Sequence, residues 1–181
     1  MEFSILYAIQ GWHTPWLDQV MRILTDMVGG IGQLWLVIAL VLCLFKKTRR
    51  CGVTVLLSYI LVLLAGQLVL KGLIVRPRPC QIDQAVALLV EHPTGSSCPS
   101  THTAWSFAGA AAIWMNHKKW GIAAGVFALV VAFSRLYLFV HFPSDVLIGA
   151  LLGVACGVAA VYIVRGIGNA VRKRRKKADT V

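Results

Sequence analysis

The chain has 181 residues, of which 58% are hydrophobic and only 14% are charged, and its mean hydropathy is +0.74. Most of these residues cannot be solvated surface, which excludes a soluble globular protein and predicts an integral membrane protein. The length suits one domain, and no internal repeat or polar linker indicates a second.

The cations greatly outnumber the anions: 18 Lys and Arg against 7 Asp and Glu give a formal net charge of +11. In a soluble protein this excess would favour nucleic-acid binding. Here the cations cluster between and after apolar runs, at 46–50, 118–119 and 172–177, where charge sets membrane topology and contacts anionic lipids. Because no recognition module accompanies the charge, we expect no nucleic-acid partner.

Residues 1–30 are expected to form short amphipathic helices at the membrane interface. Two stretches carry apolar residues at helical spacing with charged residues between them, and Pro15 separates the two. Trp12 and Trp16 would lie at the depth of the lipid headgroups. No basic segment followed by a long apolar core is present, so a cleaved signal peptide is not expected.

Five apolar runs of about the length that a bilayer requires follow this segment. They lie near 31–45, 52–70, 102–116, 120–140 and 144–164. The predicted fold is all-α, a membrane-embedded helical bundle that forms a single domain over 1–181. Its transmembrane core, 31–164, is followed by a basic cytoplasmic tail, 165–181.

The basic clusters agree on one topology. With the tail in the cytoplasm, five alternating spans place the other two clusters on the same side, as the positive-inside rule requires. The segment 71–99 and the turn around His141 then lie on the opposite face. In a bacterial inner or plasma membrane this face is the periplasm or the cell exterior.

Three polar stretches at the ends of the apolar runs carry the candidate chemistry, and the first is Lys71 to Pro79. Pro77 and Pro79 stop the second run and fix an extended segment, so that Lys71 and Arg78 can converge on one anion. A simple charged stop after a span is the alternative, but the positive-inside rule predicts such charges in the cytoplasm. The segment therefore favours phosphate binding.

The second stretch, Pro99 to His102, precedes the third apolar run. Ser100 is predicted to be the N-cap of a helix whose free backbone N–H groups and positive dipole end form an anion site. His102 would lie in the first turn, within reach of a bound group. A histidine at the membrane interface without a catalytic role is the alternative.

The third stretch contains Ser134, Arg135, His141 and Asp145. Pro143 begins the fifth run, so His141 and Asp145 lie four residues apart across a helix start, and the carboxylate can accept from one imidazole nitrogen. The other nitrogen would be left with its lone pair outward, as in His-Asp catalysis generally. The alternative is that Asp145 only caps the fifth helix.

In residue type and spacing, the three stretches over 71–145 resemble the three-part signature of the type 2 phosphatidic acid phosphatase superfamily. The resemblance implies that His141 attacks phosphorus and forms a phosphohistidine, that Asp145 orients it, and that His102 protonates the departing oxygen. It also implies which groups hold the phosphoryl oxygens: Lys71, Arg78, Ser100, Thr101 through its backbone N–H, and Arg135. Two features depart from the family, because Thr101 stands where many relatives carry Gly, and many relatives have six spans.

The expected activity is metal-independent hydrolysis of a lipid phosphate or diphosphate. Two Arg, one Lys and a helix N-terminus can offset charge on the phosphoryl oxygens, so neither a metal nor another cofactor is expected. Activity should follow a bell-shaped pH profile, because His141 must be neutral and His102 charged in the first step.

A site at the bilayer surface suits an amphiphilic substrate. Undecaprenyl diphosphate, hydrolysed to undecaprenyl phosphate, is the first candidate, as small bacterial members of the family include such enzymes. Phosphatidylglycerophosphate, phosphatidic acid and lipid A phosphates are alternatives, so the role is in cell-wall biogenesis or phospholipid metabolism. A non-catalytic membrane protein that binds anionic lipids is the alternative of another class. No obligate protein partner is expected, and the oligomeric state is open.

Two further expectations concern cysteines and glycines. Cys80 and Cys98 bracket a loop that could select substrates, and under the assigned topology they face the oxidising side, so a disulfide between them is predicted. A repeat of small residues in the fifth run favours close helix packing within the chain. Its members are Gly149, Gly153 and Gly157.

Overall fold

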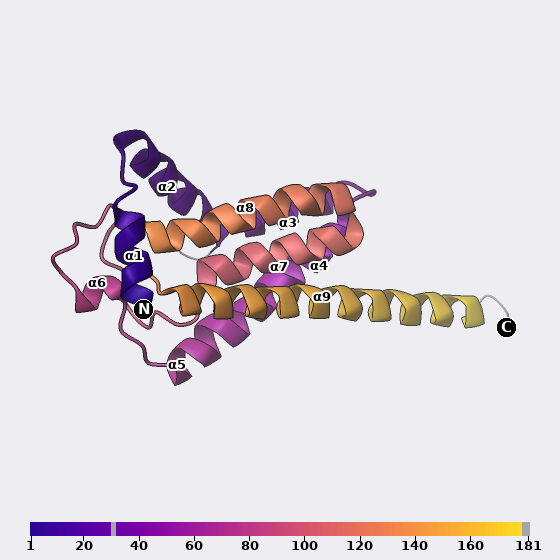
Figure 1. Ribbon diagram of the computed structural model, residues 1–181. Helices are drawn as coiled ribbons and strands as arrows, with labels where there is room; N and C mark the ends of the chain where they lie inside the picture. The colour runs from indigo at the N-terminus through magenta and orange to yellow at the C-terminus, as the bar shows by residue number, and fades with distance from the viewer. Residues whose placement is uncertain (30–31, 179–181) are drawn as a thin grey trace.

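The computed structural model describes residues 1–29 and 32–178, apart from the side chain at position 174 (Figure 1). This part of the chain is helical and contains no strand. Its elements are α1 (Glu2–Gln10), α2 (Pro15–Val28), α3 (Gln33–Leu44), α4 (Arg49–Val62), the π-helix η1 (Leu63–Leu70), α5 (Lys71–Leu73), α6 (Pro79–Ile82), α7 (Thr101–Asn116), α8 (Lys118–Tyr137) and α9 (Pro143–Ala178).

The long helices form one bundle with α7 at its centre, where it packs against α4, α8 and α9 (Figure 1). The main core lies between α3, α4 and α7. Trp35 and Trp105 are both almost fully buried there, and the indole Nε1 of Trp35 donates a hydrogen bond to Ser106 Oγ at 3.1 Å. The predicted all-α membrane bundle is confirmed at this level.

Small residues on α9 set its distance from α7. A Cβ atom added at any of three glycines would lie 2.3 to 2.6 Å from a backbone carbonyl oxygen of α7 or of its N-cap residue. The pairs are Gly149 with Ser100, Gly153 with Ala104, and Gly157 with Ala108. This confirms the predicted close packing within the chain, and it brings the first turn of α9 against the first turn of α7.

Among the described residues, three helices are long and apolar enough to cross a membrane: Arg49–Leu73, Lys118–Tyr137 and Pro143–Ala178. A fourth span results if α2 and α3, which meet at 56°, are counted together. The remaining helix of the bundle, α7, has only 16 residues, fewer than the ~20 that a bilayer requires. The protein is an integral membrane protein, and five spans remain a prediction.

The two expected N-terminal helices are present as α1 and α2, and Pro15 is the first residue of α2. Both pack against α8, and Figure 1 shows them at the end of the bundle that also carries α6. Their predicted position at a membrane interface stays a prediction. They cover the end of the bundle at which the polar stretches meet.

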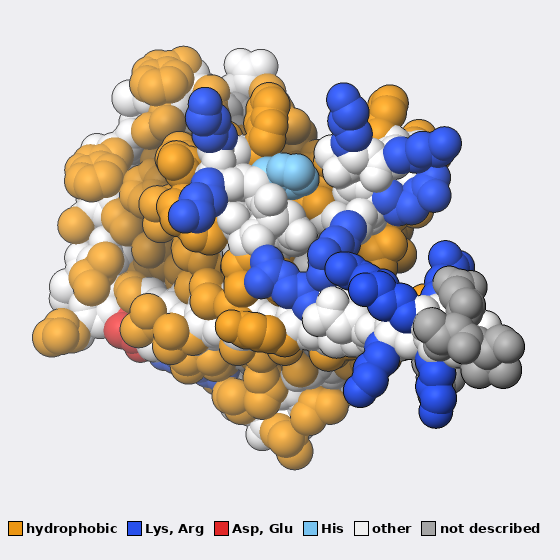
Figure 2. Space-filling model, turned by 90° about the vertical axis from the view of Figure 1, so that its right-hand side faces the viewer, with side chains coloured by type: hydrophobic (Ala, Val, Ile, Leu, Met, Phe, Trp, Pro, Cys, Tyr) orange, Lys and Arg blue, Asp and Glu red, His pale blue; other side chains and the backbone are white. Residues whose placement is uncertain are grey.

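The basic tail continues the last helix, since α9 runs without a break through 165–178 and extends well beyond the bundle (Figure 1). Lys and Arg are good helix formers, so the basic sequence does not end the helix. Figure 2 views the molecule from this side and shows Lys and Arg gathered over it. The two basic turns, at 46–50 and 118–119, lie at this same end of the bundle. Residues 179–181, and Ile31 of the first predicted run, lie outside the described residues.

The predicted Cys80–Cys98 disulfide is wrong, because both thiols are free and buried in different surroundings. Cys80 packs with Leu6 and Phe139, whereas the Cys98 thiol interacts with Asp145. Burial raises the pKa of both thiols, which keeps them protonated and unreactive at neutral pH.

The α7–α9 contact can be tested with Gly153→Ala. A Cβ at this position would lie 2.3 Å from Ala104 O, so α9 must move, and overpacking of this kind costs about 1–3 kcal/mol. We expect a lower midpoint of thermal unfolding in detergent. The matched control is Gly166→Ala on the same helix, where nothing lies within 4 Å. Equal midpoints for the two variants would contradict the packing account.

Candidate active site

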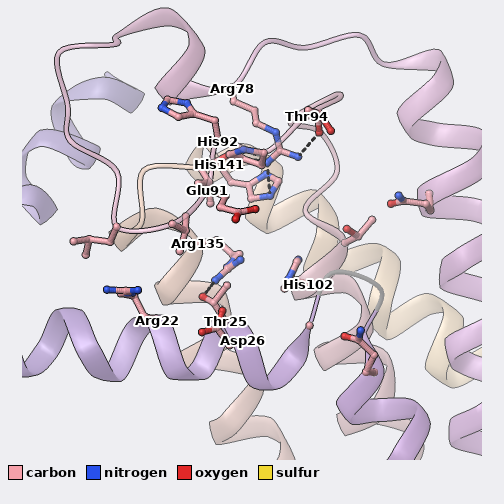
Figure 3. A pocket seen from close by; sticks show the side chains of 18 of the residues that line it. Arg22, Thr25, Asp26, Arg78, Glu91, His92, Thr94, His102, Arg135 and His141 are labelled. Atoms are coloured by element: carbon pink, nitrogen blue, oxygen red, sulfur yellow. Dashed lines mark hydrogen bonds between the residues drawn. The ribbon is translucent and has the colours of Figure 1, made fainter.

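A cavity of about 910 Å³ lies at the end of the bundle covered by α1 and α2 (Figure 3). Six of the residues predicted from the three polar stretches line it. They are Lys71, Arg78, Thr101, His102, Arg135 and His141. The structure therefore brings the three stretches together around one space. Its size is at the upper end of the usual range for ligand pockets.

His141 lies in the turn between α8 and α9 and is almost fully buried. Its Nε2 atom is 3.2 Å from Arg78 Nη1, a donor, and its Nδ1 atom faces Ser97 Oγ at 3.5 Å and Asp145 Oδ2 at 3.9 Å. These neighbours favour the tautomer with hydrogen on Nδ1 and the lone pair on Nε2. Burial is the main cause that lowers the pKa of His141, to about 4, so the ring is neutral at neutral pH.

Asp145 is fully buried, and both of its oxygens are occupied. Oδ2 accepts from Ser97 Oγ at 2.5 Å and from the backbone N of Phe142 at 2.8 Å, and Oδ1 accepts from Arg76 Nη1 at 2.6 Å. The bond to the Phe142 N–H at the start of α9 is half of a capping box. The sequence leaves two roles open for Asp145, as a cap of the last helix or as the partner that orients His141. In the structure the carboxylate caps α9, and its Oδ2 atom also faces Nδ1 of His141.

Arg78 is held by two segments of the chain. The residue is 4% exposed, and its guanidinium donates to the carbonyl oxygens of Val140, in the turn between α8 and α9, at 3.1 Å and of Gly95, in the loop that follows α6, at 3.2 Å. Burial lowers the pKa of Arg78, although an arginine remains charged at any physiological pH. These carbonyls fix the cation beside the Nε2 atom of His141.

Arg135 reaches the cavity from the last turn of α8 and is also almost fully buried. Its Nη2 atom donates to Thr25 Oγ1 on α2, and its Nε atom donates to Ser134 Oγ at 3.3 Å. Figure 3 shows Arg135 and His102 in the same cavity as His141. Helix α2 thus contacts Arg135, one of the residues predicted to hold the phosphate.

Ser100 is the N-cap residue of α7, as predicted, but its side chain caps no backbone group. It is fully buried, its Oγ pairs with Thr103 Oγ1 at 3.0 Å, and it does not line the cavity. Its backbone N donates to Asp145 O at 3.1 Å. Ser100 therefore links α7 to α9, whereas Thr101 and His102 line the cavity.

Three residues near the site were missed at the level of sequence: Ser97, Arg76 and Glu2. Ser97 lies in a loop without periodicity, and only its closeness to the Pro99 stretch could have indicated it. Arg76 belongs to the same Arg-Pro-Arg-Pro run as Arg78, so the sequence contained a signal. No sequence signal indicates Glu2, because its contact with Arg76 depends on how α1 packs against the rest of the protein.

The sequence profile of the PAP2 superfamily matches residues 52–168, well over half of the chain. The chain belongs to the PAP2 superfamily. The matched segment contains every predicted site residue, and the N-terminal helices that cover the site lie outside it.

Relatives in this superfamily bear the names of lipid phosphatases. Undecaprenyl-diphosphatase of Sulfolobus acidocaldarius is 34% identical over 130 residues, which is 71% of this chain and 63% of the relative. Undecaprenyl-diphosphatase BcrC of Bacillus subtilis is 29% identical over 168 residues, covering 87% of this chain and 81% of the relative.

Two solved PAP2 structures share the fold. Aquifex aeolicus LpxE superposes with a TM-score of 0.72 at 26% identity, covering 89% of this chain and 94% of that chain. A PAP2-type phosphatidylglycerolphosphate phosphatase from Bacillus subtilis gives 0.69 at 30% identity, covering 93% and 84%.

The contribution of Ser97 is testable because its side chain is buried behind the cavity. Ser97→Ala removes the 2.5 Å bond to Asp145, and loss of such a buried bond costs about 1–3 kcal/mol. We expect kcat for lipid phosphate hydrolysis to fall at least about tenfold with little change in KM. Ser58→Ala, which removes a buried hydroxyl bonded within α4, is the control. A raised KM at unchanged kcat would contradict this role.

Proposed function

We propose that the protein is a lipid phosphatase that works without a metal and transfers the phosphoryl group to His141. The observation that carries this proposal is the His141 ring, whose Nε2 atom faces the cavity beside Arg78 while its Nδ1 atom faces Ser97 and Asp145. Binding of an anionic headgroup alone would need cations, but not a buried imidazole oriented in this way. The alternative of a non-catalytic lipid-binding protein is therefore disfavoured.

The phosphoryl oxygens would be held by the cations that line the cavity. Lys71, Arg78 and Arg135 approach from three segments of the chain, and the backbone N–H of Thr101 lies at the N-terminus of α7. Phosphoryl transfer needs positioning and compensation of the charge on three equatorial oxygens, which these groups supply. Ser100 would act indirectly, by holding the start of α7.

The reaction would proceed in two steps. In the first, the Nε2 lone pair of His141 attacks phosphorus, the bond to the leaving oxygen breaks, and His102 donates a proton to that oxygen. The positive charge on the phosphorylated ring would be stabilised by Asp145, with Ser97 between them. In the second, neutral His102 takes a proton from water, which attacks phosphorus and releases phosphate and free His141.

Charge supports an active site on the non-cytoplasmic face. The described basic groups at 46–50, 118–119 and along the end of α9 lie at the end of the bundle opposite the cavity (Figures 1 and 2). The positive-inside rule assigns that end to the cytoplasm. A cytoplasmic C-terminus, five spans and a cavity open to the periplasm or cell exterior form one consistent topology.

We propose undecaprenyl diphosphate as the substrate and undecaprenyl phosphate as the product, which would place the protein in cell-wall biogenesis. The names of the Sulfolobus and Bacillus relatives support this choice. Phosphatidylglycerophosphate is the second candidate, because the phosphatidylglycerolphosphate phosphatase shares the fold at 30% identity. The headgroup would enter the cavity while its hydrocarbon tail stays in the lipid.

The test of the activity is release of phosphate from a short-chain prenyl diphosphate by purified protein in detergent with EDTA. We expect wild-type activity to persist and His141→Ala to lose at least about a thousandfold, because it lacks the nucleophile. His117→Ala, at the opposite end of the bundle, is the matched control and should retain activity. Activity abolished by EDTA, or retained by His141→Ala, would overturn the mechanism. The same assay with phosphatidylglycerophosphate ranks the two substrates.

A further inference from the structure

An ionic chain connects the first helix to the buried carboxylate of the site. Arg76 Nη2 donates to Glu2 Oε2 at 2.6 Å, and Arg76 Nη1 donates to Asp145 Oδ1, also at 2.6 Å. The other oxygen of Glu2 accepts from the backbone N of Ser144 at 3.1 Å and from its Oγ at 2.7 Å. Glu2 therefore touches both Arg76 and the start of α9, next to Asp145.

The position of Arg76 is fixed from several sides. Its guanidinium lies 4.2 Å from the centre of the Phe142 ring and donates to Ser144 Oγ at 2.6 Å. The pKa of Arg76 is raised, because the two carboxylates outweigh the effect of burial. The side chain of Arg76 is 28% exposed and that of Asp145 is not exposed, so Arg76 connects the surface of the protein with the buried carboxylate.

The charges of Glu2, Arg76 and Asp145 affect the proposed nucleophile, His141. Asp145 must stabilise the positive charge that His141 gains when it bonds to phosphorus. Arg76 places a full positive charge on the opposite oxygen of the same carboxylate, which weakens that stabilisation. Glu2 offsets the charge of Arg76, so that the three groups together carry one net negative charge, as an isolated carboxylate does.

We propose that Glu2 is a positioning residue for catalysis, which acts through Arg76 to keep the Asp145 carboxylate available to His141. The proposal rests on the phosphatase function proposed above, and it gives α1 a role in catalysis through Glu2. Neither Glu2 nor Arg76 lines the cavity, so both act through Asp145 and not on the substrate.

Helix α1 has other attachments that do not involve this charge. Leu6 is fully buried with Phe139, the Phe3 and Phe142 rings meet edge to face at 5.3 Å, and Tyr7 Oη donates to Asp83 Oδ2 at 2.8 Å. Replacement of Glu2 by Gln removes one charge and little volume. The helix is therefore expected to stay docked in Glu2→Gln.

Kinetics of four proteins distinguish charge compensation from simple anchoring: wild type, Glu2→Gln, Arg76→Gln and the double variant. Glu2→Gln should lower kcat about tenfold, with KM unchanged within about twofold, since an uncompensated Arg76 opposes the charge on His141. The double variant, which lacks both charges, should be faster than Glu2→Gln. A double variant that is as slow as Glu2→Gln, or slower, would overturn the proposal.

Tyr7→Phe is the matched control, because it removes another polar attachment of α1, the bond to Asp83, and leaves the Glu2–Arg76–Asp145 contacts intact. It should keep wild-type kcat and KM. If it loses as much kcat as Glu2→Gln, docking of α1 and not its charge is what matters, and the proposal is wrong.

A measurement without turnover separates this proposal from the phosphatase function. In protein labelled with [15N]histidine, the signals of His141 are identified by their absence in His141→Ala, and their shifts report the hydrogen on Nδ1. Glu2→Gln should shift the Nδ1 signal, the double variant should shift it back, and Tyr7→Phe should leave it in place. Identical spectra for wild type and Glu2→Gln would overturn the proposal, whereas inactivity of the wild type on all lipid phosphates would overturn only the function.

Discussion

The buried carboxylate of Asp145 joins parts of the molecule that are far apart along the chain. It accepts hydrogen bonds from Ser97 in the long loop, from the backbone of Phe142, and from Arg76 in the segment after α5. An unpaired carboxylate buried to this extent would cost several kcal/mol. The loop and the turn that carries His141 are therefore fixed relative to one another by the need to satisfy one acid.

The packing of α9 against α7 places the two proposed histidines around the same space. Gly149 allows α9 to approach Ser100 O, and the backbone N of Ser100 donates to Asp145 O at 3.1 Å. In a membrane, where lipid provides no hydrophobic driving force between helices, such close contacts of small residues hold a bundle together. The same contact that stabilises the fold thus sets His102, at the start of α7, across the cavity from His141.

The parts of this site that could be predicted are those with a local signal. Lys71, Arg78, His102, Arg135 and His141 stand out because charged and polar residues at the ends of apolar runs are rare and chemically specific. Their convergence on one cavity followed from alternating spans, and the structure confirms that they line the same space.

What could not be predicted depends on docking between distant segments. Glu2 and Arg76 are 74 residues apart, and no periodicity links them. The burial of Ser100 results from the approach of α9, which the glycine repeat indicates without giving its register. The predicted Cys80–Cys98 disulfide is wrong because the position of a cysteine in a loop does not reveal which way its thiol points, and the Cys98 thiol interacts with Asp145.

The central claim is that His141 carries the phosphoryl group, and the most direct measurement is to trap it there. Protein mixed with a lipid diphosphate labelled with 32P on its terminal phosphate is quenched in base, which preserves phosphohistidine, and digested for mass spectrometry. The account predicts an acid-labile label on the peptide that contains His141, which decays when turnover continues before the quench. Turnover without labelled histidine, or a label on a serine such as Ser97, would contradict it.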